Sequence, residues 1–325
     1  MSGAPVKHFD RRSIPAGAVE SVWQAGDGWP IRRIDWGTGD NHGAARGSIL
    51  FLPGRGDAYE KYLETLDYWH THGWRVTAAD WRGQAGSGRL GADAVTGHVG
   101  DFGQWVDDLA AFWTGWKAAT PGPHVLAGHS MGGHLVLRAL AERRVDPDAM
   151  VLSAPMLGLR NHGLPGALMH GAARLMCALG DRRRPAWKWS EKPGQIPEGR
   201  DLLLTHDAAR YADETFWRET RPELVMGPGS WGWVERAYAS TRGLERPGIL
   251  ESVTTPVFVV ATSADGLVDY SAIRRDVARL PHGELLSFGN EARHEILREA
   301  DPVRDAALAA IDAFLDRAAP PRPAT

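Results

Sequence analysis

Residues 124–133 read HVLAGHSMGG, and the rest of the chain can be interpreted from them. The first half of this stretch, up to His129, is short and largely apolar, which is typical of a strand buried in a parallel sheet. From Met131 onward, apolar residues recur at helical spacing, so a helix follows the strand without a loop. Ser130 lies at the junction, inside the pattern G-x-S-x-G that marks a sharp strand-to-helix turn presenting a serine hydroxyl.

The two glycines of this pattern, Gly128 and Gly132, are expected to be required, because a side chain at either would collide across the turn. The central residue of such a turn is expected to have a strained backbone, which costs about 1–3 kcal/mol. The turn leaves the N–H of Met131 at a helix N-terminus, where it can stabilise a developing negative charge on oxygen. Ser130 is therefore a candidate nucleophile, and the alternative is a glycine-rich turn with an idle serine.

The composition of the chain is that of an ordinary globular protein. The 325 residues carry a formal charge of -3, which argues against nucleic acid as the main partner. Cys177 is the single cysteine, so neither an internal disulfide nor a cysteine-based metal site is expected. Residues 1–20 do not resemble a secretory signal and no apolar run is long enough to cross a membrane, so a cytoplasmic location is expected.

Strand-like and helix-like patterns alternate on both sides of the central stretch, which predicts an α/β fold with a doubly wound, mostly parallel sheet. Further strands are expected wherever short apolar runs occur, at 31–36, 48–52, 75–79, 150–153, 257–261 and 284–288. Residues 1–20 are expected to be a weakly ordered lead-in. The expected N-cap residues of the intervening helices are all aspartates: Asp57, Asp101, Asp269 and Asp301.

The connection between Ser153 and Val257 is far longer than a βαβ crossover, which needs only ~10–12 residues. This length predicts a helical cap inserted at 157–247, with an α/β core formed by 1–156 and 248–319. The insertion interrupts the strand–helix alternation with prolines, glycines and scattered tryptophans. We find no internal repeat, so the cap is expected to be a single inserted unit.

Part of the predicted cap, residues 164–179, has a helical apolar face formed by Leu168, Met169, Ala172, Leu175 and Met176. This face would line an acyl channel, contact a lipid surface, or pack on the domain below it. A basic run lies at 182–184, followed by Lys188 and Lys192. These residues either attract a phosphate head group or an anionic bilayer, or belong to a solvated loop. Transient contact with a membrane surface through the cap is therefore one interpretation of this region.

A serine nucleophile needs a base, and the base needs an acid that orients it. After a strand-to-helix serine turn, these residues follow along the chain in the order Ser, Asp or Glu, His. Asp265 follows the strand at 257–261 and His294 follows the strand at 284–288, so both side chains are expected at the carboxyl edge of the sheet. We expect His294 to take the proton of Ser130 and Asp265 to hold the imidazole.

Each of these assignments has a competitor. Asp269 is a rival acid but is better explained as a helix cap, and His282 precedes the last strand on the wrong edge of the sheet. His129 and His134 flank the serine turn and are expected to pack or support rather than act as bases. Glu295 is interpreted as a solvated charge in preference to a supporting acid.

The second oxyanion donor is expected in the glycine-rich loop 53–56, which follows the strand at 48–52. We assign it to the N–H of Arg55, to act together with the N–H of Met131, although the loop read alone is also compatible with a simple glycine turn. The candidate substrate-binding residues lie in this loop and in the cap: Gly54, Trp231 and Trp233.

Several further motifs occur in a fixed order: DWRG at 80–83, GHVGDF at 97–102, VDDL at 106–109, SAD at 263–265 and HEIL at 294–297. With the glycine loop and the serine turn, they resemble the monoacylglycerol lipase and lysophospholipase branch of the α/β-hydrolases, a group also described as serine aminopeptidase S33-like. The resemblance implies a catalytic triad of Ser130, Asp265 and His294, and an oxyanion hole formed by the N–H groups of Arg55 and Met131.

The chain departs from this pattern at two places. Many relatives have His-Gly where this chain has Pro53-Gly54, a change expected to alter loop packing more than chemistry. Relatives often continue D-x-R-G with His-Gly, and here Gln84-Ala85 takes that place with an expected structural role.

The resemblance implies hydrolysis of a carboxylic ester through an acyl-enzyme, above all of a lysophospholipid or monoacylglycerol. The alternatives among enzymes are a small-ester carboxylesterase and a peptidase. The alternative from another class is a non-catalytic protein that binds ligands on the same fold. No metal, nucleotide or redox cofactor is expected, and the expected partner is a small-molecule or lipid ester.

Overall fold

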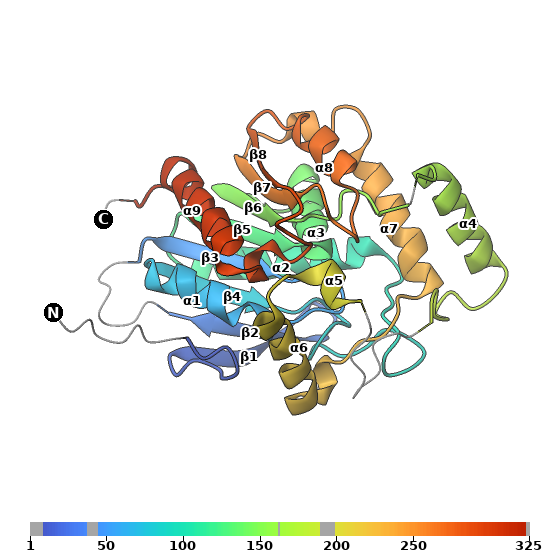
Figure 1. Ribbon diagram of the computed structural model, residues 1–325, viewed down its shortest axis with the longest axis horizontal. Helices are drawn as coiled ribbons and strands as arrows, with labels where there is room; N and C mark the ends of the chain where they lie inside the picture. The colour runs from blue at the N-terminus through green and yellow to red at the C-terminus, as the bar shows by residue number, and fades with distance from the viewer. Residues whose placement is uncertain (1–8, 38–44, 162, 189–198, 323–325) are drawn as a thin grey trace.

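The computed structural model describes residues 9–37, 45–161, 163–188 and 199–322. Within them runs one eight-stranded sheet of strand order β1-β2-β4-β3-β5-β6-β7-β8 (Figure 1). Its strands are β1 (Ala18–Gln24), β2 (Pro30–Trp36), β3 (Gly47–Leu52), β4 (Trp74–Ala79), β5 (His124–His129), β6 (Ala149–Ser153), β7 (Val257–Thr262) and β8 (Gly283–Phe288). β2 pairs antiparallel with β1 and β4, and all other pairs are parallel, which confirms the predicted mostly parallel sheet.

Helices cover both faces of this sheet. Those that flank the sheet are α1 (Leu63–Thr71), α2 (Phe102–Ala119), α3 (Met131–Ala141), α8 (Tyr270–Val277) and α9 (Asp301–Ala318). Apolar residues of α1 and α9 belong to one buried cluster, and those of α2, α3 and α8 belong to the other. Figure 1 shows α1 and α9 in front of the sheet. Both faces are therefore buried, as the continuous apolar runs in the parallel strands require.

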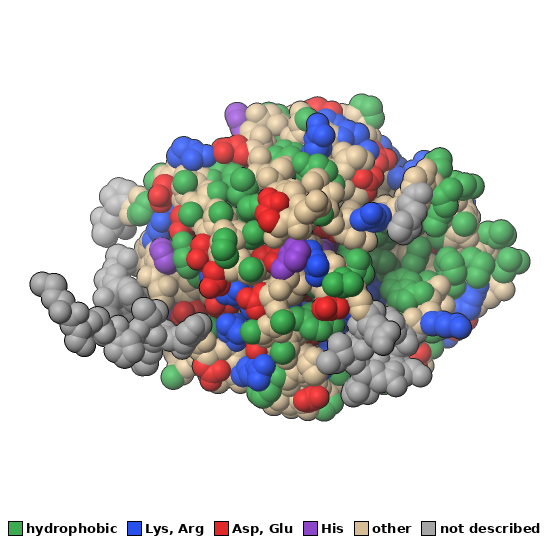
Figure 2. All heavy atoms as spheres, in the orientation of Figure 1, with side chains coloured by type: hydrophobic (Ala, Val, Ile, Leu, Met, Phe, Trp, Pro, Cys, Tyr) green, Lys and Arg blue, Asp and Glu red, His purple; other side chains and the backbone are tan. Residues whose placement is uncertain are grey.

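Between β6 and β7 the chain leaves the sheet and forms α4 (Gly166–Ala178), α5 (Asp201–Leu204), α6 (Ala208–Thr220) and α7 (Trp231–Leu244). α7 packs against α2 and α3, and α4 packs against α7. α4 lies at the right margin of Figure 1, where Figure 2 shows hydrophobic side chains gathered on the surface. These helices fall within the range 157–247 that the sequence predicts for a cap, and its limits as a domain stay a prediction.

In the described part of the chain, no helix has both the length and the apolar character that crossing a bilayer requires.

Two of the predicted helix caps are confirmed and two are wrong. The carboxylates of Asp101 and Asp269 accept hydrogen bonds from backbone N–H groups in the first turns of α2 and α8. Asp57 caps no helix, because a 3-10 turn (Tyr59–Tyr62) begins two residues later without any side-chain cap. Asp301 is the first residue of α9 rather than its N-cap, which is Ala300.

The predicted lead-in is also partly wrong. Its last residues, from Ala18, begin strand β1, and the side chains of β1 are mostly exposed. An edge strand with few buried residues leaves no apolar alternation in the sequence, so the pattern did not reveal it. Before β1, the lead-in contacts the inserted helices, where Arg11 and Arg12 pair with Asp213 of α6 at 2.5 and 2.7 Å.

Candidate active site

Ser130 occupies the sharp turn between β5 and α3 with a positive φ of 53° and a ψ of -119°. A side chain would not fit at either flanking glycine. A Cβ on Gly128 would lie 2.8 Å from the carbonyl carbon of Gly132, and one on Gly132 would lie 2.3 Å from the Pro53 oxygen. The predicted collision across the turn is thus confirmed for Gly128, whereas a Cβ on Gly132 would collide with the end of β3 and the glycine loop that follows it. The turn stores strain of about 1–3 kcal/mol at Ser130, the residue that it presents.

The structure brings the three side chains of the predicted triad together. His294 follows β8, and its Nε2 lies 3.0 Å from the Oγ of Ser130. The other ring nitrogen, Nδ1, lies 2.7 Å from Oδ2 of Asp265, a residue that follows β7. The second oxygen of Asp265 accepts hydrogen bonds from the N–H groups of Leu267 and Val268, at 2.7 and 3.0 Å. The acid is thus fixed in place, and it fixes the imidazole in turn.

Charges in this trio support one another. Burial opposes ionisation of Asp265, but His294 and the two backbone N–H groups outweigh it and hold the pKa of that carboxyl below its usual value. Burial likewise opposes protonation of His294, but Asp265 outweighs it and raises the pKa of the imidazole. Such an imidazole is a better proton acceptor than a free one.

The rival residues have other surroundings. His129 is buried with its ring centroid 4.8 Å from that of His294, and burial followed by the neighbouring imidazole lowers its pKa to about 4. Burial lowers the pKa of His134 to about 3, and its Nε2 lies 2.6 Å from the hydroxyl of Ser240. Asp269 caps α8, and His282 is exposed just before β8. The predicted packing and capping roles of these residues are consistent with these contacts.

The glycine loop 53–56 lies against the serine turn. A Cβ on Gly54 would come 3.1 Å from the Cβ of Ser130, so a larger residue there would push the loop or the serine turn apart by a few tenths of an ångström. The N–H of Gly54 donates to Asp57 Oδ2 at 3.3 Å, and the hydroxyl of Tyr62 donates to the same oxygen at 2.7 Å. Asp57 therefore shapes this loop instead of capping the helix that follows it.

A second side chain holds the other end of the loop. Gln84 Oε1 accepts from the N–H of Gly56 at 2.9 Å, and the indole of Trp81 donates to the oxygen of Pro53 at 2.9 Å. The structural role predicted for Gln84 is confirmed. The peptide of Arg55 is held between these anchored neighbours, and its part in an oxyanion hole stays a prediction.

The segment inserted between β6 and β7 reaches this loop through aromatic side chains. The indole N–H of Trp233 lies 3.4 Å from the sulfur of Met131, beside the serine turn. The guanidinium carbon of Arg55 lies 5.1 Å from the ring centroids of both Trp233 and Trp187, and its Nη2 donates to the Gly227 oxygen at 2.7 Å. Trp231 is half-buried at the start of α7, and its part in substrate binding stays a prediction.

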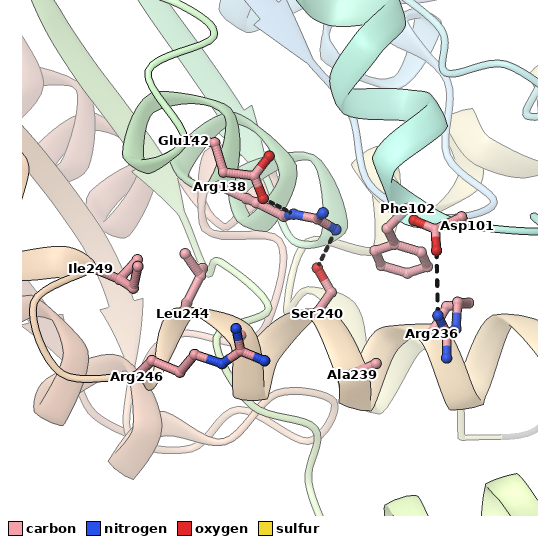
Figure 3. A pocket seen from close by; sticks show the side chains of 11 residues that line it. Asp101, Phe102, Arg138, Glu142, Arg236, Ala239, Ser240, Leu244, Arg246 and Ile249 are labelled. Atoms are coloured by element: carbon pink, nitrogen blue, oxygen red, sulfur yellow. Dashed lines mark hydrogen bonds and ion pairs between the residues drawn. The ribbon is translucent and has the colours of Figure 1, made fainter.

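Further along α7, polar contacts fix this helix to the core around a pocket of about 290 Å³ between α2, α3 and α7 (Figure 3). There Arg138 of α3 donates to the Ser240 hydroxyl at 3.0 Å, and Arg236 of α7 pairs with Asp101 at 3.3 Å. The pocket is lined by none of the predicted site residues. Its contacts hold the helix that carries Trp233.

The prediction for Glu295 is wrong, because its side chain is 3% exposed rather than solvated. One of its oxygens lies 2.6 Å from the Nζ of Lys61, and the other pairs with Arg298. Lys61 also pairs with Asp57 and with Glu214 of α6, each at 3.0 Å. Sequence reasoning missed this cluster, although the spacing of Asp57 and Lys61, four residues apart, was a usable signal.

Comparisons with known proteins agree with this fold. Residues 43–301 match the family described as serine aminopeptidase, S33. The chain is 32% identical to lysophospholipase L2 of Escherichia coli K12 over 289 residues, which cover 83% of this chain and 80% of that relative. It is 26% identical to a probable lysophospholipase L2 of Haemophilus influenzae, with 84% and 85% covered.

Among solved structures, a soluble variant of monoglyceride lipase from Saccharomyces cerevisiae has the same fold. It is similar at a TM-score of 0.74 and 19% identity, covering 97% of this chain and 99% of that one. The carboxyl esterase of Bacillus coagulans is similar at a TM-score of 0.69 and 16% identity, covering 94% and 99%. Because the family match spans most of its length, the chain belongs to the serine aminopeptidase, S33, family of α/β-hydrolases.

Proposed function

We propose that the chain is a serine hydrolase that cleaves the carboxylic ester of a lipid with one acyl chain, such as a lysophospholipid or a monoacylglycerol. The observation that carries this proposal is the continuous hydrogen-bonded line from Ser130 through His294 to Asp265, with distances of 3.0 and 2.7 Å. A nucleophile, a base and an orienting acid in this geometry are what acyl transfer requires.

In the first half of the reaction, Ser130 Oγ attacks the acyl carbon while its proton passes to His294 Nε2. The negative charge on the carbonyl oxygen is stabilised by the N–H groups of Met131 and Arg55. The ester C–O bond then breaks, and His294 gives its proton to the departing alcohol. In the second half, a water loses a proton to His294 and attacks the acyl-enzyme, which releases the carboxylic acid and restores Ser130.

The names of the relatives support the substrate class, because lysophospholipase and monoglyceride lipase are both named for substrates that carry one acyl chain. Met131 and Trp233 pack together beside the serine turn, 0% and 5% exposed, and such apolar surroundings suit an acyl chain better than a charged peptide terminus. A small-ester carboxylesterase and a peptidase are the competing outcomes of the test below.

Labelling with a fluorophosphonate probe tests the nucleophile. Ser130→Ala should abolish labelling and turnover, whereas Ser263→Ala, an exposed serine beside the acid loop, should change neither. Retained labelling in Ser130→Ala would refute the mechanism. If the wild-type protein is not labelled but binds fatty acids, it is instead a non-catalytic binding protein.

Turnover of a series of esters tests the substrate class. We expect p-nitrophenyl esters of long acids, lysophosphatidylcholine and monoacylglycerol to be cleaved in preference to p-nitrophenyl acetate and to aminoacyl amides. A sharp preference for acetate would indicate a small-ester carboxylesterase, and cleavage of the amides would indicate a peptidase. The cytoplasmic location expected from the sequence is a separate prediction that cell fractionation tests.

We further propose that α4 contacts the lipid surface from which the substrate comes. Leu168, Leu175 and Leu179 are 59%, 57% and 71% exposed, an unusual arrangement for three leucines of one helix and its end. Arg174 and Arg182–Arg184 lie on or next to this helix, while Lys192 lies outside the described residues. A helix with exposed leucines and neighbouring arginines suits an anionic bilayer.

Flotation with vesicles of phosphatidylcholine and phosphatidylglycerol tests this contact. The double variant Leu168→Ser, Leu175→Ser should float less than the wild type. The matched control, Val19→Ser with Val22→Ser, removes two residues of β1 that are equally exposed, at 64% and 55%, and should float normally. Equal flotation of the wild type and the α4 variant would overturn the proposal.

A further inference from the structure

Lys61 lies at the centre of a buried cluster of charges next to the candidate active site. Its Nζ is 2.6 Å from Glu295 Oε1 and 3.0 Å from carboxylate oxygens of both Asp57 and Glu214. The side chains of all four residues are at most 6% exposed. One ammonium group therefore joins three carboxylates that come from distant parts of the chain.

Each carboxylate belongs to a different part of the site. Asp57 accepts the hydrogen bond from Gly54, in the loop that lies against Ser130. Glu295 directly follows His294 in the sequence. Glu214 lies on α6, one of the inserted helices. The cluster thus connects the glycine loop, the histidine loop and the inserted segment through a single side chain.

The charges of the cluster depend on one another because they are buried. Burial opposes ionisation of Glu295, but Lys61 and Arg298 outweigh it and lower the pKa of this carboxyl to about 2. Burial also opposes ionisation of Glu214, and Lys61 and nearby arginines hold its pKa well below the usual value. Removing the ammonium would take away the cation that pairs with Asp57 and would leave Glu295 and Glu214 with their arginine partners alone.

We infer that Lys61 is a positioning residue for the ester hydrolysis proposed above, which holds the glycine loop in register with His294 and balances the negative charge beside that imidazole. The inference rests on the proposed function, and it adds a group that touches neither the substrate nor the reacting atoms. It acts through Asp57 on the glycine loop and through Glu295 on the histidine loop.

This role predicts the direction in which the pKa of His294 moves. The charged and titratable groups that face His294 are Asp265, Glu295, Asp57 and His129, and the cations paired with them are Lys61 and Arg298. Lys61→Met removes a positive charge from this set and raises the pKa of the imidazole. Glu295→Gln removes a negative charge and lowers it. The two variants must therefore move the acid limb of kcat/KM in opposite directions.

The test compares pH profiles of kcat/KM for a p-nitrophenyl ester in four variants. Lys61→Met should move the acid limb to higher pH, and Glu295→Gln should move it to lower pH, each by about 0.5 pH unit or more. Lys61→Met should also reduce kcat by about 10- to 100-fold, because the glycine loop is no longer held. Lys61→Arg keeps the charge and should retain the position of the limb. Lys117→Met is the matched control, since it breaks a surface pair with Asp146.

NMR titration of the His294 imidazole, assigned by comparison with His294→Gln, gives the same pKa without any need for turnover. The inference would be overturned if Glu295→Gln had the same acid limb and the same imidazole pKa as the wild type. It would also be overturned if Lys61→Met and Glu295→Gln shifted these values in the same direction. If Lys61→Met does not fold, the inference is tested by the expected shift to lower pH in Glu295→Gln and by the unchanged acid limb in Lys61→Arg. Failure of the proposed function is recognised separately, by labelling that survives Ser130→Ala.

Discussion

Replacing Gly132 by alanine would drive a methyl group into the backbone of the candidate oxyanion loop. The added Cβ would lie 2.3 Å from the oxygen of Pro53 and 2.4 Å from that of Leu52. Real Cβ atoms essentially never approach a heavy atom within 3.0 Å. Because both oxygens belong to the backbone, no side chain can rotate away, and the loop must retreat by at least about 0.7 Å.

Two opposing effects set the change in stability. Glycine to alanine inside a helix ordinarily stabilises by up to about 1 kcal/mol. Overpacking of a tight core site costs about 1–3 kcal/mol and sometimes more. We therefore expect Gly132→Ala to lower the free energy of unfolding by about 1–2 kcal/mol. The N–H of Arg55 moves with the displaced loop, so kcat should fall by about 100-fold.

Urea unfolding followed by tryptophan fluorescence measures the stability, and hydrolysis of a short p-nitrophenyl ester measures kcat. Gly115→Ala in α2 is the matched control, because a Cβ there meets nothing within 4 Å. It should stabilise the protein by about 0.5–1 kcal/mol and leave kcat unchanged. A Gly132→Ala protein as stable and as active as the wild type would refute the close packing on which this reasoning depends.

Three further predictions concern the same site. Asp265 raises the pKa of His294, so kcat/KM of the wild type should fall as the pH drops through a pKa above that of a free imidazole. Asp265→Asn should lower this pKa and so shift the fall to lower pH. Gln84→Ala leaves the Gly56 N–H without its acceptor, and denaturant titration should show a loss of about 1–3 kcal/mol. Trp233→Ala should reduce kcat/KM for long-chain esters more than for acetate, as a chain-length series would measure.

The geometry of the candidate triad could be predicted because it depends on topology rather than on fine packing. Ser130, Asp265 and His294 each follow a strand of one parallel sheet, and the carboxyl ends of such strands lie along one edge. Apolar runs identify these strands. The order along the chain sets aside His129 and His134, the helix-cap position sets aside Asp269, and the edge of the sheet sets aside His282. No detail of side-chain contact was needed.

Other features depend on residues far apart in the sequence, and local patterns do not contain them. Nothing next to Glu295 in the sequence indicates its partner, Lys61, which lies 234 positions earlier and pairs with it in the buried cluster. The apolar face of α4 was recognised as a face, but the sequence does not say what covers it. The structure leaves Leu168 and Leu175 exposed, which excludes packing of these two leucines on the domain below.

The failure of Asp57 as a helix cap has a physical cause that connects the fold with the site. A good N-cap stabilises a helix by about 1 kcal/mol, and the segment after Asp57 begins without one. The carboxylate is instead used by Gly54, Tyr62 and Lys61, which fix the glycine loop against Ser130. Ser130 itself breaks a local rule with its positive φ. Departures from local sequence rules are expected where a conformation serves function, and Asp57 and Ser130 both lie at the candidate active site.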